Sequence, residues 1–415
     1  MDSKQIGEQS YRWVVLGLYC SSVVANALIW ISVSPITSSV AQVYGVSKIW
    51  VEMCSLVYMV LYIPMVFPSN YILDNLGLKT GVFIGTALTA LGSLARLGAY
   101  YEFWYILLGS TLAGLGQPFL LSAPAKVAAF WFRPEMRTFA TTMGAVANPL
   151  GIALGFVLPA AIDGVSTKSD VGLLMLIQAS VVVPIGVLVF VLFKNKPKVP
   201  PSYTAGQERE KFLKSIKDCF RSRSFNALLV AFSMGQGSLN ALATLLEQIS
   251  SPYGFNEDDN SLFGALVIVA GLVGSGLAGL IVSWNQKYKA AVLVMMFGAV
   301  GGLLAFTLTL ELGSLPVSCI FCTLLGLLLM PILPISFEFV CELTYPIGEA
   351  TTGGLLNSGG QVVGITQIGL AYLLSNSPLL ISFISIVGLL VGAVGLFFCK
   401  EDLKRTNCDN LLETD

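Results

Sequence analysis

The chain has 415 residues, of which 55% are hydrophobic and only 11% are charged, and its formal net charge is −1. Ordinary soluble domains have about 25% charged residues, so this composition indicates an integral membrane protein and gives no reason to expect nucleic-acid binding. The eight cysteines are scattered, mostly in apolar stretches where a thiol behaves as a small hydrophobe. We therefore expect neither a metal site nor a cofactor.

Twelve apolar segments are long enough to cross a membrane, because a transmembrane helix needs about 20 mostly apolar residues. They predict an all-α membrane protein of twelve transmembrane helices. The expected spans are 13–40, 49–71, 80–99, 104–130, 138–161, 172–193, 224–249, 261–284, 289–309, 315–341, 347–373 and 378–399.

The longest polar break separates six spans from six. It predicts an N-terminal six-helix bundle over 1–193, a cytoplasmic linker over 194–223, a C-terminal six-helix bundle over 224–399 and a cytoplasmic tail over 400–415. If the N-terminus is inside, every Lys and Arg except Lys48, Arg96 and Lys168 lies on the inner side. The positive-inside rule then makes both termini cytoplasmic. We expect the plasma membrane rather than a lysosomal or other internal membrane.

Two sets of six helices joined by a central cytoplasmic linker are typical of the major facilitator superfamily, whose binding site lies near the midplane between the two halves. The first inner loop, 74–79, reads D-x-x-G-x-K, which resembles the gate motif of that superfamily. We expect Gly77 to allow a tight turn and Asp74 to interact with a neighbouring helix end. The equivalent loop after the eighth span, 283–287, has no acid.

None of the twelve segments carries a charged residue near its centre. Trp30, Gln117 and Gln361 stand there instead, and burying such groups is costly unless they meet a partner or a water-filled cavity. The alternative for the glutamines is hydrogen bonding between helices. Asn148, in the middle of the fifth span, has the same two interpretations.

The first span carries Asn26, Trp30 and Ser34 on one helical face, because they are four residues apart, and we expect Asn26 and Trp30 to contact the substrate. Trp30 lies too deep for an interfacial anchor, and an indole face attracts a cation. Tyr58 and Tyr62 lie one turn apart on the second span. They either extend the aromatic wall of a substrate site or only pack between helices.

Acidic and basic residues near the inner span ends predict an inner gate closed by salt bridges. The expected acids are Glu338, Glu342 and Glu349, and the expected bases are Lys126, Arg133 and Arg137. Tight proton coupling has no obvious carrier, because no ionisable residue lies at a span midpoint.

The stretches 333–346, 353–357 and 360–364 resemble the feline leukaemia virus subgroup C receptor-related proteins, solute carrier family 49. The resemblance covers nearly all of the membrane region. It implies a major facilitator fold and facilitated, membrane-potential-sensitive transport of choline or ethanolamine, with haem export attributed to one branch and vitamin B6 uptake to another. It also implies a substrate site at Trp30, Gln117 and Gln361.

One departure concerns the seventh span, where choline carriers supply aromatic residues about one turn before a T-L-L sequence. Here those positions hold Leu239 and Asn240. The aromatic cage is therefore thinner on the C-terminal half, and Asn240 joins the candidate substrate contacts.

The leading hypothesis is a facilitative, alternating-access carrier of a small organic cation or amine, acting as a monomer. A haem or porphyrin exporter and a pyridoxine transporter are the alternatives. The chain has no His to ligate haem iron and no central base for porphyrin carboxylates. A non-transporting receptor is disfavoured because no sizeable extracellular domain is expected, and no set of catalytic groups indicates an enzyme.

Overall fold

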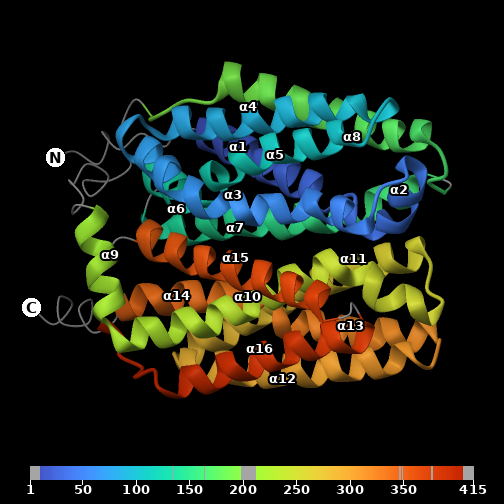
Figure 1. Ribbon diagram of the computed structural model, residues 1–415. Coiled ribbons are helices and arrows are strands. Elements are labelled where there is room, and N and C mark those ends of the chain that lie inside the picture. Colours follow the sequence, from blue (N-terminus) through green and yellow to red (C-terminus); the bar gives the residue numbers. More distant parts are fainter. Residues whose placement is uncertain are drawn as a thin grey trace, which may run out of the picture. The chain divides into compact units, whose positions relative to one another are not determined.

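The computed structural model describes residues 10–132, 134–162, 164–197, 212–344, 347, 349–374 and 377–404. The described elements are all helices, as expected for an all-α membrane protein. The chain divides into two compact units, Met1–Glu208 and Arg209–Asp415, which are described one at a time (Figure 1).

The N-terminal unit contains the first six expected spans. Its elements are α1 (Tyr11–Ile31), η2 (Ser34–Ile36), α2 (Thr37–Tyr44), α3 (Lys48–Asn75), α4 (Leu78–Arg96), η3 (Leu97–Tyr100), α5 (Trp104–Leu121), α6 (Pro124–Trp131), α7 (Pro134–Val157), η4 (Leu158–Ala161) and α8 (Lys168–Leu192). Helix α4 packs along α5 and α8, while α1 packs along α7.

The C-terminal unit begins with a short amphipathic helix and continues with the remaining spans. Its elements are α9 (Phe212–Arg221), α10 (Arg223–Ser250), η6 (Ser251–Tyr253), α11 (Glu257–Asn285), α12 (Tyr288–Leu310), α13 (Leu315–Leu329), α14 (Ile332–Thr344), α15 (Glu349–Leu373) and α16 (Pro378–Phe397). Helix α10 packs along α15 and α16.

Eleven described segments are long and apolar enough to cross a membrane. Helix α15 covers the remaining expected span and has 25 residues, but it is not among the eleven. Its apolar character is diluted by Asn357, Gln361, Gln367 and several glycines. Such a composition suits a helix that faces protein and carries polar groups for function.

Three expected spans are each broken into two helices rather than continuous. The first span breaks between α1 and α2, the fourth between α5 and α6, and the tenth between α13 and α14. Pro35, Pro124 and Pro331 stand at these breaks. Proline removes an N–H donor from the helical hydrogen-bond ladder, so it favours an interruption at each of these positions.

Small residues bring the site-bearing helices close together. A Cβ at Gly92 of α4 would lie 2.4 Å from the carbonyl oxygen of Gly109 in α5, and one at Gly116 would lie 2.5 Å from the carbonyl oxygen of Gly85. Glycine allows this backbone approach, as is common at membrane helix interfaces. The approach fixes the depth of Gln117, which follows Gly116, relative to α4.

Candidate functional site

Trp30 lies in the last turn of α1 and is only 5% exposed. Its indole N–H donates to the backbone carbonyl of Ser55 in α3 at 3.0 Å, and the Ser55 hydroxyl donates to the Trp30 carbonyl at 3.1 Å. The indole N–H is thus satisfied by the protein itself. What Trp30 retains for a solute is the face of its ring, the part that attracts a cation.

Asn26 is one helical turn before Trp30, and its amide bonds to neighbouring helices. The side-chain nitrogen donates to the hydroxyl of Thr89 in α4 and to the carbonyl of Ala113 in α5, both at 2.9 Å. Both N–H bonds of the amide are therefore used within the unit. The contacts correspond to the interhelical bonding that polar residues form in membrane bundles, which locates α1 against α4 and α5.

Gln117 is 5% exposed in α5, and its side-chain oxygen has no hydrogen-bond partner among the described residues. The hydroxyl of Tyr58, fully buried in α3, is also without a hydrogen-bond partner in the described part of the chain. Helices α3 and α5 meet at Gly114, where a Cβ would lie 3.2 Å from the Cα of Tyr58. A buried acceptor left unpaired costs about 1–3 kcal/mol, so Gln117 is a group that a solute or water would complete.

Asn148 is half-buried in α7, in the same unit. Ser34 lies in η2, beyond the end of α1, so it does not continue the helical face of Asn26 and Trp30. The four-residue spacing predicted that Ser34 would share this face, but α1 ends at Ile31, before Ser34 is reached.

In the C-terminal unit, Asn240 of α10 donates to the side-chain oxygen of Gln361 in α15 at 3.2 Å. Both side chains are buried. The sequence placed both among the candidate contacts without predicting that they bond to each other. This pair leaves the NH₂ group of Gln361 and the oxygen of Asn240 to act on other groups.

Gln236 is a residue that the sequence analysis missed. It lies one turn before Asn240, and its side-chain oxygen has no hydrogen-bond partner among the described residues. That oxygen is so near α15 that a Cβ at Gly360 would lie 2.4 Å from it. The signal was present, because Gln236, Asn240, Thr244 and Gln248 recur at four-residue intervals along α10.

Arg96, one of the three basic residues expected on the outer side, is completely buried at the end of α4. Its guanidinium donates to the carbonyl of Ile29 and to the side-chain oxygen of Gln178, both at 3.0 Å. Glu52 of α3 and Glu247 of α10 are also buried. Ionisable side chains inside membrane segments are functional candidates by default.

The expected gating residues are only partly described. Lys126 donates from its ammonium group to the carbonyl of Leu73 at 2.6 Å, near the end of α3. On α14, Glu342 is buried and Glu338 is exposed. Arg133 and the side chains of Asp74, Arg137 and Glu349 lie outside the described residues. The salt-bridge gate stays a prediction.

The turn expected at Gly77 is confirmed, because this residue has a φ of +100° immediately before α4. Asn195, after α8, packs against it and accepts a hydrogen bond from the backbone N–H of Lys79 at 3.2 Å. A Cβ at Gly77 would lie 2.7 Å from the Asn195 side chain. In the equivalent loop of the C-terminal unit, Gln286 takes a positive φ of 53° at the end of α11.

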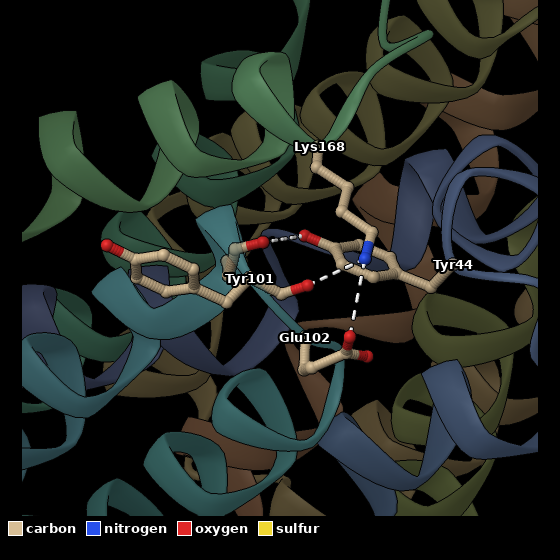
Figure 2. Close-up of polar contacts among 5 residues, drawn as sticks. Tyr44, Tyr101, Glu102 and Lys168 are labelled. Carbon is tan, nitrogen blue, oxygen red and sulfur yellow. Dashed lines mark hydrogen bonds and ion pairs between the residues drawn. The ribbon is translucent and has the colours of Figure 1, made fainter.

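A polar cluster joins α2 and α8 to η3 and to the loop between η3 and α5 (Figure 2). Lys168 donates to the carbonyl of Tyr101 at 2.6 Å and lies 3.5 Å from the Glu102 carboxylate, while the Tyr44 hydroxyl donates to the carbonyl of Ala99. The ion pair is largely exposed and contributes little by itself. The cluster fixes α2, the second half of the broken first span, to its neighbours.

The Major Facilitator Superfamily model matches residues 19–368 of the chain. The uncharacterized MFS-type transporter C09D4.1 of Caenorhabditis elegans is 34% identical over 411 residues, covering 95% of this chain and 70% of that protein. The choline/ethanolamine transporter FLVCR1 of Felis catus is 31% identical over 413 residues, covering 95% and 74%. The crystal structure of a D-xylose-proton symporter matches with a TM-score of 0.71 at 12% identity, covering 95% and 98%, a likeness of fold alone.

Proposed function

We propose that this chain, which belongs to the feline leukaemia virus subgroup C receptor-related family of the major facilitator superfamily, transports a small organic amine of the choline or ethanolamine type. Membership of this family makes the chain a multi-pass membrane transporter and not an enzyme. The proposed mode is facilitative transport by alternating access. The substrate class is supported by two relatives named choline/ethanolamine transporters, FLVCR1 of Felis catus and FLVCR2 of Homo sapiens, which are 31% and 30% identical to this chain.

The observation that carries the proposal is the unpaired, buried side-chain oxygen of Gln117. An uncharged acceptor suits the hydroxyl or ammonium hydrogens of such an amine. Trp30 suits the cationic end, because its N–H is already bonded to Ser55 and its ring face is the remaining group. In the C-terminal unit we propose Gln361 and Asn240 as further contacts.

The proposed energy source is the membrane potential. A cation entering a negative interior gains about 2.3 kcal/mol per charge for each 100 mV. We further propose that residues 1–193 and 224–399 act as the two halves of the transporter. The protein is a monomer in the plasma membrane, and both of its termini face the cytoplasm. The inner gate consists of the bases Lys126, Arg133 and Arg137 and the acids Asp74, Glu338, Glu342 and Glu349.

The test is uptake of labelled choline and ethanolamine into proteoliposomes with an imposed negative interior potential. Trp30→Ala should weaken the apparent affinity about thirtyfold, because a desolvated cation–π contact contributes about 2 kcal/mol. Trp284→Ala is the matched control, since Trp284 is 82% exposed. Uptake no faster than in empty vesicles, with transport of pyridoxine or haem instead, would refute the proposed substrate.

A second comparison isolates Gln117. Gln117→Leu should weaken choline binding about fivefold to tenfold, because one hydrogen bond contributes about 1–1.5 kcal/mol. The same change should leave binding of tetramethylammonium, which has no hydroxyl, unaltered. Equal losses for both cations would show that Gln117 does not accept from the choline hydroxyl.

A further inference from the structure

The first membrane span has an interrupted backbone next to Trp30. Helix α1 ends at Ile31, and Pro35 lies in the short turn η2 that follows. The last four carbonyls of any helix lack intrahelical partners, and inside a membrane no bulk water replaces them. Ile29 and Trp30 are both among the last four residues of α1, so their carbonyls require partners from outside the helix.

Neighbouring helices supply most of these partners, and the hydroxyl of Ser32, just past the end of α1, also donates to the Ile29 carbonyl at 3.2 Å. The Arg96 guanidinium donates to the Ile29 carbonyl at 3.0 Å, and Ser55 donates to the Trp30 carbonyl at 3.1 Å. Arg96 also donates to Gln178 of α8 at 3.0 Å and contacts the Ser32 hydroxyl at 3.4 Å. The planar fork of an arginine presents up to five N–H donors in fixed directions, whereas a lysine ammonium presents three donors at the end of a flexible stem.

The fold makes room for this side chain. A Cβ at Gly109 of α5 would lie 2.4 Å from the Cγ of Arg96, so only glycine allows the arginine stem to pass there. The described partners of the guanidinium are all uncharged. Its positive charge also lies at the negative end of the α1 dipole, where a cation is favoured.

The second unit provides an internal comparison. Its first long helix, α10, runs unbroken for 28 residues to Ser250. Helix α12, which follows two membrane helices later as α4 does in the first unit, has no basic residue in its last turn and ends at Leu310. Among the described helices, the first unit therefore combines an interrupted first span with a buried arginine at the end of its third span. The second unit has a continuous first span and no basic residue in the last turn of its third span.

We propose that Arg96 is a positioning residue for substrate binding: by capping the broken end of α1 it fixes the orientation of the Trp30 ring. The proposal rests on the proposed function insofar as Trp30 contacts the amine. Arg96 itself does not contact the substrate in this scheme, and it acts through the Ile29 carbonyl and the last turn of α1.

The test is a double-mutant cycle on choline binding by purified full-length protein in nanodiscs. Arg96→Gln should weaken binding about tenfold when Trp30 is present and less than twofold in the Trp30→Ala background. Arg96→Lys, which keeps the charge but not the fork, should give a smaller loss of about threefold. Arg221→Gln, at an exposed arginine, is the control. Unchanged binding in Arg96→Gln, or an equal loss in both backgrounds, would overturn the proposal.

A substrate-free measurement separates this proposal from the proposed function. Subtracting the fluorescence of a Trp30→Phe variant isolates the emission of Trp30. In Arg96→Gln, or in the milder Arg96→Lys, that emission should shift to longer wavelength as the ring loses its fixed position. If choline does not bind at all, the proposed function fails, while the shift still supports the positioning role and an unaltered spectrum still overturns it.

Discussion

Replacing Asn26 by leucine tests whether this residue binds substrate or joins helices. The change keeps the branched shape of the side chain and removes the two hydrogen bonds to Thr89 and Ala113, each 2.9 Å long. Thr89 retains a hydrogen bond of its own to the carbonyl of Gly85 at 2.8 Å, so its hydroxyl is not left without a partner. The loss should therefore approximate the net value of the two bonds.

The magnitude follows from measurements on membrane helices, where an interhelical hydrogen bond contributes about 0.6 kcal/mol on average and about 1.7 at most. Two bonds give about 1–3 kcal/mol. For a unit of this size, 1 kcal/mol corresponds to about 2–4 °C, so the melting temperature should fall by about 2–12 °C. The affinity for choline should change less than threefold, because the amide nitrogen is not offered to a solute.

The assay is thermal unfolding of the protein in nanodiscs by differential scanning fluorimetry, combined with choline binding on the same samples. Thr89→Val serves as the matched variant. It removes one of the two acceptors and leaves a buried N–H of Asn26 unpaired, so it should destabilise the protein by about 1–3 kcal/mol, as much as Asn26→Leu does. The reasoning is refuted if Asn26→Leu leaves the melting temperature unchanged while choline binding is lost. That result would return Asn26 to the substrate contacts.

Two further substitutions and one chemical modification test the loops and the linker helix. Gly77→Ala should lower both melting temperature and uptake, because φ is +100° there and a Cβ would meet Asn195 at 2.7 Å; full activity would contradict this. Gln286→Gly should stabilise the protein by about 1 kcal/mol in thermal unfolding by relieving a left-handed φ of 53°, and a lower melting temperature would argue against strain. Burial, followed by the Asp218 carboxylate, raises the pKa of Cys219 to about 11. Alkylation of Cys219 by iodoacetamide, followed by peptide mass spectrometry, should therefore quicken about tenfold per pH unit from pH 7 to 10, and a plateau below pH 9 would contradict the raised pKa.

The membrane spans were predictable because hydrophobic length is a local property of the sequence. The breaks within them were not, since proline alone does not decide whether a helix ends. Pro64 and Pro149 lie inside continuous helices, whereas Pro35 and Pro331 stand at breaks. Whether the freed carbonyls find donors on neighbouring helices decides the outcome, and that depends on packing between distant segments.

The candidate site was predictable in its residue types but not in its contacts. Counting residues along each span places Gln117 and Gln361 near their midpoints, and the structure buries both. It also pairs Gln361 with Asn240, a contact between positions 121 residues apart. Arg96 was assigned to the outer side because basic residues are counted by loop. Its burial depends on acceptors from α1 and α8 that no single-helix pattern displays.

Four buried side chains of the N-terminal unit share one kind of acceptor. Asn26, Trp30, Arg96 and Lys126 each donate to a main-chain carbonyl of another segment. A carbonyl remains whatever side chain its residue carries, so substitution at the accepting position does not remove the contact. We therefore expect genetic screens to recover loss-of-function alleles at the four donors, with few at the accepting residues other than Ser55, whose own hydroxyl donates to the Trp30 carbonyl.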